Sequence, residues 1–124
     1  MSTTSPKRSH DSFDTLREKL RRFATERDWD QFHSPKNLAM ALSVEAAELL
    51  EHFQWLSDAE SAAVPSEKRT KIREELADVL LYLIRLADKL DIDLATAAAD
   101  KLSVNAQKYP VQKARGNSKK YTEL

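Results

Sequence analysis

The chain has 124 residues, with twenty basic and twenty acidic side chains, one glycine and no cysteine. The balanced charge excludes a global field that would attract a nucleic acid polymer or an anionic membrane, and the lack of cysteine excludes disulfides, thiolate catalysis and zinc ribbons. No apolar run reaches the roughly 20 residues that cross a bilayer, and the first residues lack the apolar core of a signal peptide. Because alanine, leucine, glutamate and lysine dominate, we expect an all-α cytoplasmic protein of one domain.

Four helices are predicted in a domain of residues 11–110, between a flexible segment, residues 1–10, and a basic tail, residues 111–124. The first helix begins near Ser12, since apolar residues recur at three- and four-residue steps from Phe13 to Phe23. Its pattern breaks at Asp28. The next segment holds two aromatic residues and a histidine, and loops of this kind usually bind a ligand or complete a core.

The second helix begins at Ser34 and Pro35, because serine caps a helix and proline suits its first position. We expect it to run to about Trp55, followed by a linker, SDAESAAVP. Ser66 is predicted to cap a third helix that continues to roughly Leu90, with its apolar stripe at Ile72, Leu76, Val79, Leu80, Leu83, Ala87 and Leu90. The short linker predicts that the second and third helices are antiparallel neighbours.

A fourth helix is predicted from a cap at Asp93 to about Lys108. Lys101, Asn105 and Lys108 share one face of it, and further basic residues follow in the tail, so that together they could neutralise a triphosphate. Basic side chains near a helix end also fit the helix dipole, which makes this group a weak indicator by itself. The sequence contains no GxxxxGK[ST] or GxGxxG loop.

Two acidic pairs, Glu45-x-x-Glu48 and Glu75-x-x-Asp78, lie among apolar residues on the second and third predicted helices. Residues three apart project from one helix face, close enough to share a cation. Carboxylates at the edge of a core are costly unless a basic partner, a raised pKa or a metal compensates them. No lysine or arginine interrupts either stripe, so the pattern predicts a metal site. Solvated helix acids are the simpler alternative in a chain that is 32% charged.

Four oxygen ligands without sulfur favour Mg²⁺, with Mn²⁺ as a substitute, over zinc. A di-iron site is disfavoured, because such bundles use Glu-x-x-His and neither pair has a histidine three residues on. His52, four residues after Glu48, fits a partly exposed helix residue better than a ligand. Flat side chains on which a base could stack, or which could fill the core instead, are Trp29, Phe32, Trp55 and Tyr82.

The chain resembles the all-α nucleoside triphosphate pyrophosphohydrolases of the MazG-like superfamily, most closely the dCTP pyrophosphatase branch. The resemblance extends from Phe23 to Leu124 and is carried by ERDWDQFHSPKNL, VEAAELLEHFQW, EELADVLLYL, KLSVNAQKYP and SKKYTEL. It implies a four-helix-bundle-type fold and Mg²⁺-dependent hydrolysis of a deoxynucleoside triphosphate to the monophosphate and pyrophosphate. The substrate would be dCTP or a modified dCTP, for nucleotide pool control or cleaning. It also implies a homotetramer built from dimers.

By position, the resemblance implies that the metal ligands and catalytic residues are Glu45, Glu48, Glu75 and Asp78. The base and sugar pocket would be formed by Trp29, Asp30, Gln31, Phe32, His33, Trp55 and Tyr82. The residues that reach the phosphates or the sugar would be Lys101 and Asn105. Two positions depart from the family. Val44 stands where the wider superfamily often has a glutamate, and Leu20-Arg21-Arg22 stands where the branch has a histidine, which leaves the base preference open.

A different function is a non-catalytic helical module that binds a nucleotide or a partner chain. In that case the acids would face lysines across the bundle, and no metal would be needed. The enzyme interpretation instead expects Glu45 or Glu48 to orient a water molecule for attack on the α-phosphorus. Apolar residues off the main helix faces, namely Leu50, Leu81 and Ile84, are expected to be buried against another copy of the chain.

Overall fold

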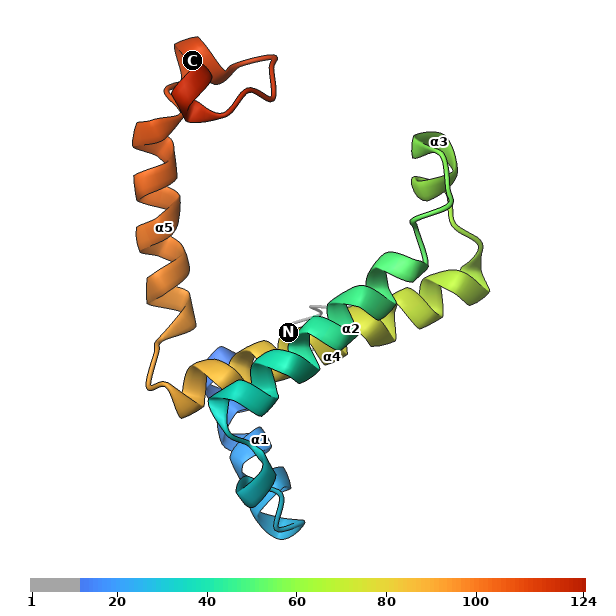
Figure 1. Cartoon of the computed structure of the whole chain (residues 1–124), viewed down its shortest axis with the longest axis vertical. Coiled ribbons are helices and arrows are strands. Elements are labelled where there is room, and N and C mark those ends of the chain that lie inside the picture. The colour runs from blue at the N-terminus through green and yellow to red at the C-terminus, as the bar shows by residue number, and fades with distance from the viewer. Residues whose placement is uncertain (1–11) are drawn as a thin grey trace, which may run out of the picture. The chain divides into compact units, whose positions relative to one another are not determined.

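The computed structural model describes residues 12–124, which contain helices and no strand, so the predicted all-α class is confirmed (Figure 1). The chain divides into two compact units between Asp91 and Ile92. The helices of the first unit are α1 (Phe13–Glu26), η1 (Asp30–Phe32), α2 (Pro35–Glu51), α3 (Asp58–Ser61) and α4 (Ser66–Lys89). Those of the second are α5 (Leu94–Lys108), α6 (Val111–Ala114) and η2 (Tyr121–Glu123). The expected segment of residues 1–10 lies outside the described residues.

Three of the predicted helix starts are confirmed by their capping bonds. Ser12 and Ser34 each accept a hydrogen bond from the backbone N–H three residues on, at 3.1 Å, and Asp93 accepts one at 3.0 Å. A capping side chain of this kind satisfies one of the N–H groups that a first helical turn leaves unpaired. Short-range chemistry therefore sets these boundaries.

Other boundaries differ from the prediction. α2 ends at Glu51 because the next residues form tighter turns, whose hydrogen bonds join residues three positions apart. The Phe53 N–H donates to the Leu50 carbonyl at 2.9 Å. α4 begins at Ser66 itself, with Pro65 in the capping position. The tail, expected only to be basic and polar, contains α6 and η2.

The predicted linker contains a short helix, α3, with a capping box at its start. The Glu60 N–H donates to the Ser57 hydroxyl at 3.1 Å, and the Ser57 N–H donates to the Glu60 carboxylate at 2.9 Å. The sequence carries the signal for this box, a serine followed three residues later by a glutamate.

The core of the first unit lies where α4 packs against α2 and α1, and α2 and α4 are the predicted antiparallel neighbours (Figure 1). Its buried apolar side chains are Ala24, Leu38, Ile72, Ile84 and Ala87. The expectation that Ile84 would lie off the core was wrong, because its side chain is 3% exposed. Three members of the predicted stripe, Leu76, Leu83 and Leu90, are instead exposed at the surface. The buried face of α4 is therefore rotated about the helix axis relative to the predicted apolar stripe.

In the second unit, aromatic and basic side chains connect the end of α5 to η2. The rings of Tyr109 and Tyr121 meet edge to face at 6.1 Å between centroids, and the Lys108 ammonium lies 4.8 Å from the Tyr121 ring centroid. Among residues 12–124, no helix combines the length and the apolar character that a bilayer crossing requires.

Candidate metal centre and adjoining cavity

The antiparallel pairing of α2 and α4 brings three of the four predicted metal ligands together. Carboxylate oxygens of Glu45 and Glu48 on α2 and of Glu75 on α4 lie within 4.8 Å of one another. Asp78 is outside this set, close enough that its negative charge helps to raise the pKa of Glu45. The two acidic pairs therefore face each other, with Asp78 at the edge of the cluster.

The cluster is electrostatically incomplete. One oxygen of Glu45 and one of Glu75 are buried without a hydrogen-bond partner among the described residues. Burial, and then the nearby carboxyl groups of Glu75 and Glu48, raise the pKa of Glu45 to about 7. An unpaired buried carboxylate oxygen is costly, and a hard divalent cation, which prefers carboxylate ligands, removes that cost. The residues present thus fit a divalent metal ion.

A cavity of about 220 Å³ opens next to Asp78, between α1, the segment after it and α4. Its residues are Leu20, Phe23, Ala24, Trp29, His33, Asp78, Leu81, Tyr82 and Arg85. Three of the predicted pocket residues, Trp29, His33 and Tyr82, are therefore brought together. Asp78 belongs to both an acidic pair and this lining, so the cavity adjoins the candidate metal centre.

The end of α1 fixes the direction in which the chain enters the cavity wall. Asp28 has a left-handed backbone, with φ at 54°, and the Trp29 N–H donates back to the Ala24 carbonyl at 2.9 Å. The Asp28 N–H donates to the Thr25 carbonyl at 3.1 Å, which completes the paired bonds of a Schellman motif. Trp29 follows at once, with its ring edge to face with Phe23 at 5.6 Å between centroids.

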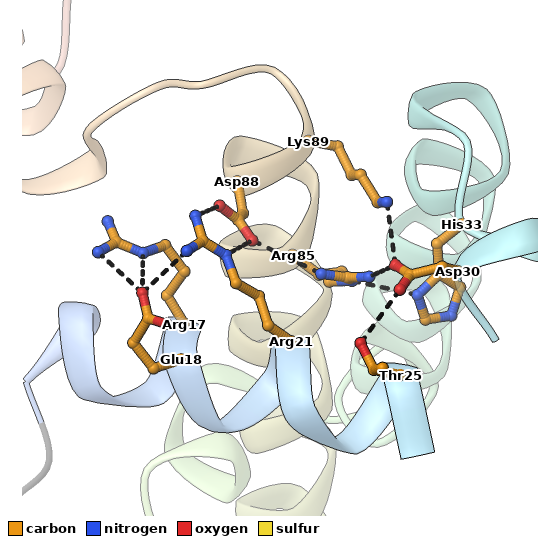
Figure 2. Close-up of polar contacts among 9 residues, drawn as sticks. All are labelled: Arg17, Glu18, Arg21, Thr25, Asp30, His33, Arg85, Asp88 and Lys89. Atoms are coloured by element: carbon orange, nitrogen blue, oxygen red, sulfur yellow. Dashed lines mark hydrogen bonds and ion pairs between the residues drawn. The ribbon is translucent and has the colours of Figure 1, made fainter. Parts of the chain in front are cut away.

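A chain of ionic contacts lies beside the cavity, and we call Arg21, Asp30, Arg85, Asp88 and Lys89 the ion network (Figure 2). The Arg85 side chain, only 5% exposed, forms ion pairs with Asp30 and, at 3.5 Å, with Asp88. Lys89 also binds Asp30, at 3.0 Å, and Arg21 binds Asp88, at 2.8 Å. Each carboxylate of the network has at least two cationic partners.

These contacts shift the pKa values of the groups involved. The hydrogen bond from Lys89 is the largest cause that lowers the pKa of Asp30, and the one from Arg21 does the same for Asp88. Burial, and then the charge of Arg85, lower the pKa of His33 below its usual value. The network therefore holds both carboxylates ionised and the imidazole of His33 neutral.

Sequence reasoning missed Arg85, although a signal was present. Asp78, Tyr82 and Arg85 follow one another at steps of four and three residues, so they share one helix face, and all three line the cavity. The signal was a cationic residue, Arg85, on the same helix face as the predicted ligand Asp78 and the predicted pocket residue Tyr82. Its partners come from distant parts of the chain, which no local pattern reveals.

The other predicted site residues lie outside the cavity lining. Gln31 bonds back to Asp28, and Phe32 is 58% exposed. Trp55, in the turn after α2, is 86% exposed. Lys101 and Asn105 lie on α5 in the second unit, and the roles of all these residues stay predictions. His52 occupies the C-cap of α2 and is not part of the acidic cluster found among residues 12–124.

Comparisons with known proteins agree on one family. The sequence model of the MazG-like family matches residues 40–124. A mouse protein, dCTP pyrophosphatase 1, is 50% identical over 104 residues, which cover 82% of this chain and 61% of the mouse protein. The human dCTP pyrophosphatase 1 is 44% identical over 128 residues, covering 98% of this chain and 75% of the human one. The crystal structure of a pyrophosphatase from Archaeoglobus fulgidus superposes with a TM-score of 0.76 at 40% identity, covering 86% of this chain and 99% of that one.

Proposed function

The chain belongs to the MazG-like family, and on this basis we propose that it hydrolyses a deoxynucleoside triphosphate, dCTP or a modified dCTP, to the monophosphate and pyrophosphate. The proposal includes Mg²⁺ as cofactor and a role in cytoplasmic nucleotide pool control or cleaning. One observation carries it: the acidic cluster adjoins, through Asp78, a cavity with aromatic walls. A nucleotide needs both parts, since its phosphates require a cation and its base a flat apolar surface.

Each part of the site has a proposed task. Glu45, Glu48, Glu75 and Asp78 would hold Mg²⁺, which when bound neutralises the charge that develops on the phosphates. The carboxylate of Glu45 or Glu48 would orient a water molecule in line with the α-phosphorus and accept its proton. The water oxygen then forms a bond to the α-phosphorus as the bond from that phosphorus to the bridging oxygen breaks, and pyrophosphate leaves with that oxygen. No covalent intermediate with the protein is needed.

The cavity binds the base in this proposal. Trp29 and Tyr82 supply flat surfaces, and stacking of a base on an aromatic side chain is worth roughly 1 to 3 kcal/mol. The cavity volume of about 220 Å³ is below the roughly 300 to 1,000 Å³ of sites for drug-sized ligands, which fits a cavity that takes the base and not the whole nucleotide. We further propose that Trp55 adds an aromatic surface, while the phosphate or sugar role of Lys101 and Asn105, which belong to the second unit, stays a prediction from the sequence.

Assembly is part of the proposal. Large apolar side chains remain exposed along α2, among them Met40 at 53%, Val44 at 56% and Leu50 at 58%. Such a row of exposed apolar residues is usually covered by a partner, so we propose a homotetramer built from dimers. Light scattering at micromolar concentration should give the mass of four chains, and a stable monomer would contradict this proposal.

The test of the activity is direct. The protein is incubated with dCTP and Mg²⁺, and the products are resolved by ion-exchange chromatography and ³¹P NMR. We expect dCMP and pyrophosphate in equal amounts, and no turnover in excess EDTA. Orthophosphate with dCDP would mean cleavage at the γ-phosphate and would overturn the proposed reaction.

The non-catalytic module is the second candidate, and the site argues against it. That interpretation expected lysines opposite the acids, yet within residues 12–124 none of the four acids forms an ion pair with a lysine or arginine. It would be supported if dCTP bound equally well with and without Mg²⁺ and was recovered intact.

A further inference from the structure

The contact between Arg85 and His33 fixes more than the position of the imidazole. The Arg85 Nε–H donates a hydrogen bond to the Nδ1 atom of His33 at 3.2 Å. A guanidinium group can only donate, so Nδ1 must be the acceptor and carries no proton. A neutral imidazole has one N–H group, which is therefore on Nε2.

Arg85 is itself held from two sides. Its side chain is 5% exposed and forms ion pairs with Asp30 and Asp88. Asp30 is anchored in turn by Lys89 at 3.0 Å and by the Thr25 hydroxyl at 3.3 Å (Figure 2). Arginine stays protonated at any ordinary pH, so the donor that faces Nδ1 is permanent.

We infer that Arg85 is a positioning residue that locks His33 in its Nε2–H tautomer, so that the cavity presents one fixed hydrogen-bond donor to an acceptor atom of the bound base. The inference rests on the proposed function, since it gives the cavity a base to select. The lowered pKa of His33 agrees with it, because a neutral ring is what the tautomer requires.

The fixed donor discriminates between pyrimidines. Ring atom N3 of cytosine is a hydrogen-bond acceptor, whereas N3 of uracil and thymine carries a proton and is a donor. An imidazole held as Nε2–H therefore pairs with N3 of cytosine and opposes N3–H of the other two bases. Released from Arg85, the ring could adopt the Nδ1–H tautomer and accept a bond from N3–H, so discrimination would weaken.

The key variant is Arg85→Lys, which keeps the positive charge and loses the planar fork that reaches His33 and both carboxylates. We expect the ratio of kcat/KM for dCTP to that for dUTP to fall about tenfold, the size of one mispaired hydrogen bond. Most of the change should be in KM for dCTP, because the acidic cluster is untouched. The matched control is Arg21→Lys, in the same network but bonded to Asp88 and not to His33, and it should leave the ratio unchanged.

A second readout needs no substrate. Ring ¹⁵N signals of His33 in the free protein should show the Nε2–H tautomer alone, and Arg85→Lys should show a mixture of tautomers. Should Arg85→Lys fail to fold, Asp30→Asn replaces it, since it loosens the hold on Arg85 from a half-exposed site and should move both readouts in the same direction.

Two results would overturn the inference: an Nδ1–H tautomer in the unmodified protein, or a tautomer and a dCTP to dUTP ratio that the variants leave unchanged. A protein that turns over no nucleotide would instead overturn the proposed function, while the ¹⁵N signals would still decide whether Arg85 sets the tautomer.

Discussion

The acidic cluster and the ion network lie along the same helix, α4, and treat charge in opposite ways. In the cluster, Glu75 of α4 meets Glu45 and Glu48 of α2, and two buried oxygens have no partner among the described residues. In the network, each of the carboxylates of Asp30 and Asp88 has at least two cationic partners. One region needs a ligand to be complete, and the other is complete within the chain. We therefore expect substitutions in the cluster to change metal-dependent activity, and substitutions in the network to change the free energy of unfolding.

The largest effect should come from Glu48→Gln or Asp78→Asn. Each change keeps the side-chain shape and removes a charge that we propose to bind a hard cation, so pyrophosphate release should fall to background while the circular dichroism of the helices stays the same. The matched control is Glu74→Gln, an exposed acid on α4 next to Glu75, which should keep its rate. A near-normal Mg²⁺-dependent rate in either cluster variant would mean that the metal site is misassigned.

On the other side of the comparison, Arg85→Met should lower the free energy of unfolding by about 2 to 3 kcal/mol, near the lower end of what the loss of one buried ion-pair partner costs. Lys89 and Arg21 keep part of the compensation for Asp30 and Asp88. Urea unfolding measures the change. Arg17→Met, in an exposed pair with Asp14, should cost less than about 1 kcal/mol, and equal losses in both variants would show that the network has no special weight.

Trp55 lies outside both regions, and its variant tests whether the site extends beyond them. Trp55→Ala should raise the apparent KM for dCTP by about tenfold, because the base loses a stacking surface. The side chain is 86% exposed, so the thermal midpoint of a single chain should not change. Trp55→Phe keeps an aromatic face and should lose less. A loss of folding without a change in KM would show that this tryptophan serves packing.

The smallest effect is a pH dependence confined to the cluster. Because the pKa of Glu45 in the folded protein is raised from 4.5 to about 7, the folded state holds a proton that the unfolded state releases. Stability of the metal-free protein from this group is therefore complete below pH 4.5 and is lost as the pH rises through about 7.

Glu45→Gln should remove that loss. By scanning calorimetry in EDTA, the variant should melt a few degrees above the unmodified protein at pH 8 and match it near pH 4. Added Mg²⁺ should raise the melting midpoint of the unmodified protein more than that of the variant. Because the lowered pKa values of Asp30 and Asp88 act in the opposite direction, the deciding quantity is the difference between the two proteins: a difference in midpoint that does not grow from pH 4 to pH 8 would contradict the raised pKa.

The parts that sequence could predict are those decided within a few residues. Helix starts at Ser12, Ser34 and Asp93 depend on a bond to a residue three positions away, and the acidic spacing depends on the helix period. The facing of Glu45 and Glu75 followed from a short connection between two helices. The capping box at Ser57 was equally local and was overlooked.

The ion network could not be predicted in the same way. Arg85 meets His33 from 52 positions away, and Arg21 meets Asp88 from 67 positions away. An arginine within an apolar helix has the same sequence pattern whether it is exposed or buried, and only its tertiary partners decide which. The exposure of Trp55 is also a property of the packed helices, not of its neighbours in sequence.

The left-handed turn at Asp28 makes the wall of the proposed base cavity depend on one backbone dihedral angle. Trp29 and His33 enter the cavity wall from the chain direction that this residue sets, with φ at 54°. Glycine or asparagine can adopt that angle at little cost, and a β-branched residue cannot. We therefore expect a β-branched residue at position 28 to displace Trp29 and His33 together, and so to disturb the proposed base site without replacing any residue that lines the cavity.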